Sequence, residues 1–379
     1  MSGAHKLLRR LCTVVVGLVF YLAGMVKLLD PTGAGLVMDE YFKFFHLGFL
    51  AFLSKPAGVG MALTETLLGA ALIAGVWRKW TALLTSILAA GFTILTLILV
   101  IANPEMDCGC FGEAIHLSHF QTFAKNVILC ILCAVAFLPA RDYSPTRKAK
   151  VTAFAIAALL AAALCVCSLT HLPLIDFTEF AVGTDLCGET GSEETSPYTV
   201  IYAKDGVEKS FSLEDLPDST WTFVRQGDVT LSMSDEAPLL SISNASGEYR
   251  DEVLKEGDVM VFGIYDARRE DVVDRVGEAM ESISACTPVA ISREYIPELD
   301  SYTADFKKII TLNRSNGGAT LIRDGVITAK WTAGALPDDA AIEEVLAQSP
   351  EETFSRRIQR GNIAFEGIMI FSLALLLLL

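Results

Sequence analysis

Charged residues are scarce in this chain of 379 residues: Asp, Glu, Lys and Arg make up 20% of it, and hydrophobic residues 52%. An ordinary soluble domain carries about 25% charged residues, so the composition excludes a wholly soluble protein. Cysteine is sparse as well. Nine cysteines spread along the chain are too few and too dispersed for a small scaffold held together by disulfides.

Basic residues are also in deficit, and the formal net charge is −15. A surface this negative repels phosphate, so we expect no nucleic-acid partner. The deficit is uneven, because residues 1–171 hold 13 Lys and Arg against 8 Asp and Glu (net +5), whereas residues 172–362 hold 17 against 36 (net −19). The acidic part is therefore expected to be a separate, soluble region.

Long apolar runs are what the chain has instead. A membrane-spanning helix needs about 20 apolar residues, and the runs that approach this length are 11–29, 59–76, 81–102, 122–139, 151–171 and 363–379. The first lacks a small-residue cleavage site and other spans follow it, so we interpret it as a retained anchor. The last is either a tail anchor or a truncated span.

These runs predict a mostly α-helical membrane protein with a bundle of four to five transmembrane helices, a soluble α/β domain and a further C-terminal membrane segment. The expected divisions are 1–140 for the bundle, 141–172 for the fifth helix, 173–254 for a linker and small β-rich segment, 255–349 for the α/β domain and 350–379 for the last segment. The aromatic stretch within 30–56 is expected to lie flat in the membrane interface or to re-enter the bundle.

Orientation follows from the basic residues between the spans, which favour the cytoplasmic side. They lie at 5–10, at 78–79 and at 141–150. Residues 103–121 and everything after the fifth span should then face outward. We expect a multi-pass protein of the cytoplasmic (inner) membrane, in contact with the lipid bilayer, whose acidic domain is extracytoplasmic.

The acidic region shows a change of pattern along its length. A hairpin is predicted at 198–213 around Asp205-Gly206, and a short strand at 239–243. Strands then alternate with helices. The expected elements are a strand at 259–265, a helix at 269–284, a strand at 288–292, a helix at 304–310, strands at 320–323 and 326–331, and a helix at 339–347.

This order resembles a thioredoxin-like fold, with helices on both faces of a central sheet. Redox-active members carry Cys-x-x-Cys where the first strand meets the first helix, but here that junction, 265–269, has no thiol. The turn Asn316-Gly317-Gly318 stands where thioredoxins present a cis-proline. The resemblance therefore implies a catalytically silent module suited to docking.

The clearest chemical motif is Cys108-Gly109-Cys110, in the loop between the third and fourth spans. Two thiols can cycle between dithiol and disulfide with envelope protein thiols as partners, and Gly109 gives the backbone freedom for the sulfurs to meet. Two alternatives remain. One is a static disulfide that pins the loop, and the other is a zinc or copper site that the pair forms together with His116 and His119.

Charges in or near the apolar runs are costly and are usually paired or exposed to water. Lys27 and Lys125 are expected near the Cys-Gly-Cys loop, where an ammonium group would favour the thiolate form. Alternatively, Lys27 and Glu65 neutralise each other, or the lysines extend to lipid headgroups.

Four further cysteines lie in the spans: Cys130, Cys133, Cys165 and Cys167. They are either a relay toward a membrane quinone, by architectural analogy with the vitamin K epoxide reductase type of bundle, or small apolar residues.

Several strings together carry a resemblance to the DoxX/MauE-like membrane proteins over residues 11 to about 140: Gly24-Met-Val-Lys27-Leu-Leu-Asp30-Pro31, Glu65 with Gly69, Asp107-Cys-Gly-Cys-Phe-Gly112, and Gln121-Thr-Phe-Ala-Lys125-Asn126. MauE takes its name from methylamine utilisation, and proteins of this type are implicated in forming disulfides in methylamine dehydrogenase. Larger relatives in the Bacteroidetes pair the bundle with an extracytoplasmic tail.

The resemblance implies a membrane-embedded thiol-disulfide redox protein of the cell envelope that acts through Cys108 and Cys110. The main competing interpretation is a non-enzymatic anchor or sensor whose outer domain binds an envelope partner. A transporter ranks last, because only the intramembrane charges favour it.

Overall fold

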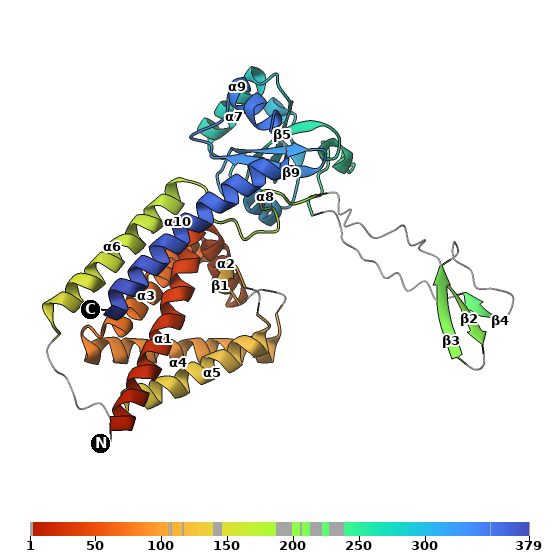
Figure 1. Ribbon diagram of the computed structural model, residues 1–379. Coiled ribbons are helices and arrows are strands. Elements are labelled where there is room, and N and C mark those ends of the chain that lie inside the picture. The colour runs from red at the N-terminus through yellow and green to blue at the C-terminus, as the bar shows by residue number, and fades with distance from the viewer. Residues whose placement is uncertain are drawn as a thin grey trace. The chain divides into compact units, whose positions relative to one another are not determined.

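The computed structural model describes residues 3–104, 106, 108–115, 117–138, 146–186, 199–204, 207–212, 222–226, 239–348 and 350–378. The chain forms two compact units. The membrane unit comprises Met1–Ala181, Thr311–Ser315 and Gln348–Leu379, and the sheet unit comprises Val182–Ile310 and Asn316–Ala347. The first is a helical bundle and the second is an α/β region (Figure 1), which confirms the predicted fold class of a membrane bundle with a soluble α/β part.

Among the described residues, six helices are long and apolar enough to cross a bilayer. They correspond to the six apolar runs of the sequence. Their bounds are α1 Gly3–Leu29, α3 Ser54–Ala74 with the preceding 3-10 helix η1 Gly48–Leu53, α4 Arg78–Ala102, α5 His119–Phe137, α6 Lys148–Thr170, and the part of α10 (Pro350–Leu378) from Gly361 onward.

The C-terminal helix is part of the bundle. It packs against α6, and the Tyr21 hydroxyl in the middle of α1 lies 2.7 Å from the Ser372 hydroxyl, to which it donates a buried hydrogen bond. Met369 and Leu376 of α10 belong to one buried apolar cluster with Tyr21 of α1 and Leu164 of α6. The last apolar run is therefore a packed helix of the membrane unit.

Small residues allow α1 and α3 to approach closely along their length (Figure 1). A Cβ atom added at Gly17 would lie 2.9 Å from Ile73, and one added at Gly24 or Gly69 would meet the backbone of the other helix. Helices in a membrane associate closely where such residues line the interface. This contact holds the two helices, and the side chains between them, at a fixed distance.

Basic residues gather at one end of the bundle. Arg9 near the start of α1 donates to the carbonyl oxygen of Ala136 near the end of α5, at 3.0 Å. Lys150 at the start of α6 donates to the carbonyl oxygen of Ala74 at the end of α3, at 2.9 Å. Because successive spans alternate in direction, the loop that follows α4 lies at the opposite end.

The stretch after α1 contains a helix that the sequence analysis did not predict, α2 (Pro31–Phe44). Asp30 caps it, with its carboxylate accepting from the backbone N–H of Gly33 at 2.9 Å, and Pro31 occupies the first helical position. The helix packs against α3. This part of the segment 30–56 is therefore a helix packed against α3, and α2 forms one wall of the site described below.

The sheet unit has a five-stranded sheet in the order β7-β6-β5-β8-β9. Strand β5 is parallel to β6 and antiparallel to β8, and β8 is antiparallel to β9. The elements are η2 Asp251–Leu254, β5 Asp258–Ile264, α7 Glu270–Ser282, β6 Thr287–Ser292, η3 Pro297–Leu299, β7 Tyr302–Thr303, α8 Phe306–Leu312, β8 Gly318–Arg323, β9 Val326–Trp331 and α9 Asp339–Leu346.

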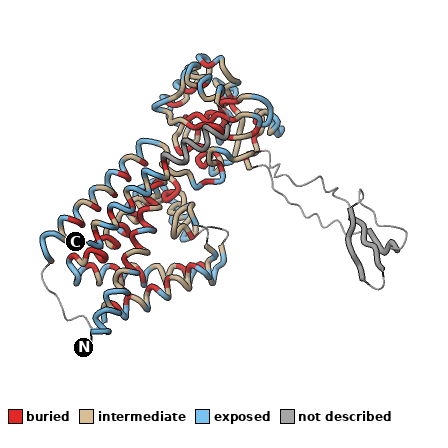
Figure 2. Tube along the Cα trace, in the orientation of Figure 1, coloured by how far each residue is buried: buried red, intermediate tan, exposed pale blue. Residues whose placement is uncertain are grey.

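Apolar residues of β5, β8 and β9 form the core of this sheet with one side of α7 and α9, and Figure 2 shows these strands as largely buried. The order of strands and helices predicted from 259 to 347 is confirmed element by element. The predicted strand at 239–243 is wrong, because only Ser243 forms a bridge there, to Tyr249 and Thr303. The short edge strand β7 was not predicted.

A second, three-stranded sheet has the order β3-β2-β4. Its strands are β2 Thr199–Lys204, β3 Val207–Ser212 and β4 Thr222–Gln226. Strands β2 and β3 are antiparallel, which confirms the predicted hairpin. Its turn residues, Asp205 and Gly206, lie outside the described residues.

The junction between β5 and α7, where no thiol stands, is held by Asn316. Its side-chain oxygen accepts hydrogen bonds from the backbone N–H groups of Tyr265 and Asp266, at 2.9 and 3.0 Å, and its side-chain nitrogen donates to the Asp266 carbonyl at 3.0 Å. The amide therefore satisfies three backbone groups of the turn and leaves it little freedom to open.

Candidate functional site

The Cys-Gly-Cys loop follows α4 and leads through the short strand β1 (Cys110–Glu113) toward α5. Cys108 is 6% exposed, and Cys110 is partly exposed. Gly109 and Gly112 have φ of +58° and +57°, a conformation that favours glycine. A Cβ atom at Gly109 would also overlap the Val37 side chain of α2. The two glycines therefore allow a tight loop against α2.

Tyr41 of α2 holds the backbone of Cys108 in place. Its hydroxyl donates to the backbone carbonyl oxygen of Cys108 at 2.9 Å. Burial, followed by the nearby Cys110 and Cys108 thiols and Glu40, raises the pKa of Tyr41 above the ordinary value of a phenol. The phenol thus keeps its proton at physiological pH, which it needs in order to donate this hydrogen bond.

His119, the first residue of α5, contacts the sulfur of Cys108. The distance from Cys108 Sγ to His119 Nδ1 is 3.0 Å, and His119 Nε2 lies 3.0 Å from the carbonyl oxygen of Pro104. A carbonyl oxygen can only accept, so Nε2 carries the proton, and in the neutral ring Nδ1 must then accept from the Cys108 S–H. The ring is oriented to take the thiol proton, which would leave a thiolate beside an imidazolium.

Lys27 of α1 and Glu65 of α3 form a buried ion pair across the close helix contact. The Lys27 Nζ atom lies 2.8 and 2.6 Å from the two carboxylate oxygens, and the side chains are 10% and 4% exposed. This ion pair corresponds to one of the alternatives left open by the sequence, and the supporting role of the two residues at the thiol loop stays a prediction. The pair is also close to the loop, since a Cβ atom at Gly112 would lie 3.9 Å from Lys27 Cγ.

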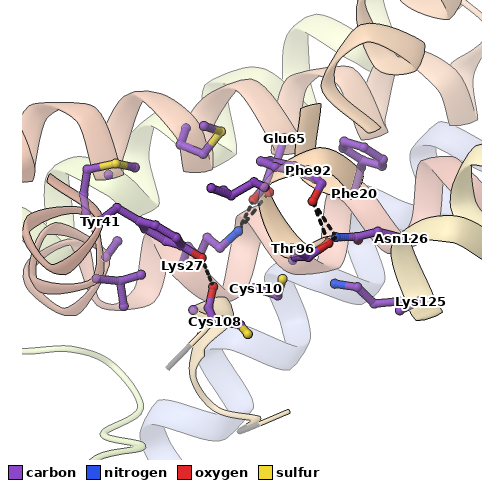
Figure 3. Close-up of a pocket in the computed structure, with 18 of the residues that line it drawn as sticks. Phe20, Lys27, Tyr41, Glu65, Phe92, Thr96, Cys108, Cys110, Lys125 and Asn126 are labelled. Atoms are coloured by element: carbon purple, nitrogen blue, oxygen red, sulfur yellow. Dashed lines mark hydrogen bonds and ion pairs between the residues drawn. The ribbon is translucent and has the colours of Figure 1, made fainter. Parts of the chain in front are cut away.

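A cavity of about 290 Å³ lies between α1, α2, α3, α4, α5 and the loop. Its polar lining includes Lys27, Tyr41, Glu65, Lys125 and Asn126, and both Cys108 and Cys110 border it. Figure 3 shows Lys27 pointing toward Glu65 and Asn126 pointing toward Thr96, with Cys108 and Cys110 near both groups. The cavity therefore joins the thiol pair to the interior of the bundle.

Two polar residues of the wall are held by the helices themselves. The Asn126 side-chain nitrogen lies 3.3 Å from the Phe92 carbonyl oxygen and 3.3 Å from the Thr96 hydroxyl oxygen. Lys125 places its Nζ atom 4.7 Å from the centre of the Phe111 ring, a distance typical of a cation–π contact. Lys125 is thus oriented by the loop that carries the thiols.

The cavity brings together Cys108, Cys110, Lys27, Glu65 and Lys125. The four cysteines proposed as a relay lie elsewhere in the spans, and none of them lines this cavity. Cys133 and Cys165 are buried, and Cys130 lies 3.2 Å from the Thr93 hydroxyl oxygen. The relay role of all four cysteines, Cys167 included, stays a prediction.

The metal hypothesis joined Cys108 and Cys110 to His116 and His119. The structure brings Cys108 and His119 together, and His116 lies outside the described residues. Within the part of the chain that is described, no group of three or more His, Cys, Asp and Glu side chains is arranged to hold a metal ion. The four-ligand site therefore stays a prediction.

Sequence reasoning missed three features of the site. It assigned His119 only as a metal ligand, it gave no role to Tyr41, and it did not anticipate Thr96 with Asn126. For His119, the Ser118 cap would have been a signal, because Ser118 and Gln121 form a capping box that starts α5. A helix that starts at residue 119 places His119 in its first turn, beside the end of the loop.

Comparisons with known proteins agree with this architecture. Residues 5–139 match the family model of methylamine utilisation protein MauE, and residues 197–231, which include β2, β3 and β4, match a domain of unknown function, DUF8463. No curated protein and no solved structure matches the chain.

The six apolar helices and the soluble α/β region define a multi-pass membrane protein. Over residues 5–139 it is similar to the MauE family, in agreement with the resemblance found in the sequence.

Proposed function

We propose that this protein exchanges thiols and disulfides with proteins of the cell envelope through Cys108 and Cys110. The observation that carries the proposal is the hydrogen-bonded chain from Cys108 through His119 to the Pro104 carbonyl. A buried thiol whose neighbour is oriented to accept its proton is an activated nucleophile and a good leaving group.

In the oxidised protein, a substrate thiolate attacks the more exposed sulfur, that of Cys110. The Cys108–Cys110 bond breaks, Cys108 leaves as a thiolate beside His119, which holds the proton that the substrate thiol has lost, and a mixed disulfide joins Cys110 to the substrate. A second substrate thiolate then attacks the substrate sulfur of this bond and releases Cys110. The substrate dithiol loses two electrons and becomes a disulfide, and the cysteine pair gains them.

The location of the pair is part of the proposal. Basic residues gather at one end of the bundle and the thiol loop lies at the other, so the tendency of basic residues to remain inside favours an extracytoplasmic loop in the cytoplasmic membrane. Structural disulfides are made on that side of the membrane, which is where a thiol-exchange protein would find its substrates.

For the sheet unit we propose a docking role on a thioredoxin-like fold. The order β6-β5-β8-β9, with β5 parallel to β6 and the other pairs antiparallel, supports that fold. The junction held by Asn316 has no thiol, so redox chemistry is left to the membrane unit. This same feature favours the second candidate function, a non-enzymatic anchor or sensor whose soluble part binds an envelope partner.

Covalent trapping separates the two. In cells that carry Cys108→Ala, we expect the Cys110 thiolate to attack a substrate disulfide, release one substrate thiolate and retain the substrate protein as a mixed disulfide that dithiothreitol releases, because no Cys108 thiol is present to displace it. Cys110→Ala should trap less, since Cys108 is nearly buried, and the double variant should trap none. If the three variants retain the same amount of attached protein and dithiothreitol releases none of it, the anchor is favoured and the exchange reaction is excluded.

A further inference from the structure

The cavity beside the thiol pair offers a site for the electron acceptor, an inference that rests on the proposed function. A dithiol formed by exchange must be reoxidised before the next cycle. We propose that the cavity between α1, α2, α3, α4 and α5 binds the head group of a lipid-soluble quinone, which oxidises Cys108 and Cys110 directly.

The walls of the cavity match a planar, mostly apolar ring. Phe20 and Phe92, whose ring centres are 6.4 Å apart, are joined by Phe42 of α2. The volume of about 290 Å³ is near the lower end of the range for small-molecule pockets, which starts at about 300 Å³. It therefore suits a head group, with a tail that extends elsewhere.

The polar groups of the cavity match the two carbonyl oxygens of a quinone, which are hydrogen-bond acceptors. Lys27 and Lys125 border the cavity from α1 and α5. An ammonium group has three N–H donors, and among the described residues the Nζ atom of Lys27 contacts only Glu65. Because Glu65 already neutralises Lys27, Lys125 is the positive group that would stabilise the negative charge that develops on a carbonyl oxygen on reduction.

The tail of a quinone also has a place. An apolar groove between α3 and α4 shares Met61, Phe92 and Leu95 with the cavity, and it is lined elsewhere by residues such as Leu68 and Ile87. Apart from the Thr64 hydroxyl, its lining side chains carry no polar group. Because the groove borders the cavity at these three residues and lies on helices long enough to span the membrane, an isoprenoid chain could extend along it into the lipid.

The reaction balances without another reagent. The two thiols lose two electrons and two protons and form the S–S bond, and the quinone gains them as two hydroxyl groups and leaves as a quinol. No passage of electrons through Cys130, Cys133, Cys165 or Cys167 is needed. Those cysteines can then be ordinary apolar residues of their helices.

The test uses the full-length protein in lipid nanodiscs with decylubiquinone. Decylubiquinone is mixed anaerobically with the reduced protein. Absorbance should show that one equivalent of quinone is reduced for each pair of thiols that no longer reacts with an alkylating agent. Leu95→Trp, which fills the shared part of the cavity and groove, should slow this reaction tenfold or more. Ile94→Trp, on the exposed side of the same helix, should leave it unchanged.

Binding is measured separately in the Cys108→Ser/Cys110→Ser variant, which cannot turn over. An azido-benzoquinone should label peptides of α3 or α4 that contain Met61 or Phe92, and decylubiquinone should compete. Competition by oleate as effective as that by decylubiquinone would assign the cavity to a lipid chain and overturn the inference.

The remaining outcomes are also distinguishable. If the wild type exchanges disulfides with a dithiol but neither binds nor reduces decylubiquinone, the quinone site is wrong and the proposed function stands. If the quinone binds but the cysteine pair reacts with neither the dithiol nor decylubiquinone, the acceptor role and the proposed function fail together.

Discussion

The contact between Cys108 and His119 makes the reactivity of one thiol depend on one ring. In a Cys110→Ser background, which leaves Cys108 as the loop thiol, we expect His119→Gln to slow alkylation of Cys108 at pH 7 by about tenfold, because a free thiol is only a few per cent ionised there. The pH profile of the labelling rate should also change, because His119 no longer accepts the thiol proton. The measurement is the rate of iodoacetamide labelling, resolved by peptide mass spectrometry.

His171→Gln is the matched control, because His171 is exposed at the end of α6. It should leave the profile unchanged. If His119→Gln and His171→Gln give the same profile as the parent, the activation of Cys108 by His119 is excluded.

The pair of Lys27 and Glu65 is expected to matter for folding as well as for the site. Lys27→Met leaves a buried carboxylate without its partner, and breaking a buried pair in this way costs about 3–5 kcal/mol. Lys27→Met with Glu65→Gln should recover most of that loss, because no unpaired charge remains. Thermal unfolding in detergent, followed by intrinsic fluorescence, measures both, and a double variant no more stable than Lys27→Met would contradict this account.

Cys286 of the sheet unit should stay unreactive when the loop thiols react. Burial, followed by the nearby Asp258 and Asp339 carboxylates, raises the pKa of Cys286 to about 11. Below that pH the group remains a neutral thiol, with roughly a thousandth of it ionised at pH 8. Its alkylation should rise only above about pH 10, and rapid labelling at pH 8 would show that this thiol is not shielded.

The sequence was sufficient to name some residues of the site and insufficient for others. Cys108, Cys110, Lys27, Glu65 and Lys125 could be predicted because thiols and charges are unusual in or beside apolar runs. The pairing of Cys108 with His119 depends on how the loop between α4 and α5 folds back, and spacing along the chain does not determine that. Tyr41 entered the site only because α2 packs against α3.

Among the helices, the contact between α1 and α3 should be the most sensitive to side-chain size. Gly69→Val places methyl groups where the backbone of Tyr21 lies, and the helices must separate to accept them. Gly60→Val in the same helix meets open space and is the control. We expect Gly69→Val, and not Gly60→Val, to become sensitive to trypsin in detergent, and equal resistance would show that the close approach is dispensable.

The long elements were predictable for a physical reason. A run of about 20 apolar residues has few alternatives to a membrane helix, and all six runs formed one. The alternation of strands and helices from β5 to α9 is equally plain, because buried strands and amphipathic helices differ in period. Segment 239–243 looked like a strand by composition, yet its buried Leu240 and Ile242 are held by packing and only Ser243 pairs.

In the membrane, the two ends of the bundle should be accessible from opposite sides. In a variant whose nine native cysteines are replaced by serine, a cysteine introduced as Ile115→Cys, beside the thiol loop, should react with a membrane-impermeant maleimide added to cells whose outer layers are permeable. One introduced as Thr146→Cys, near the basic residues before α6, should react only after the cytoplasmic membrane is opened. The reverse pattern would place the thiols in the cytoplasm and remove the oxidising surroundings that the proposed function requires.

The most direct measurement is the redox state of Cys108 and Cys110 in membranes, read as a mass shift after labelling with a large maleimide. The account predicts that both thiols become protected together under oxidant, that dithiothreitol restores both, and that the cycle repeats. A pair that stays alkylatable under oxidant, or stays protected under reductant, would contradict it.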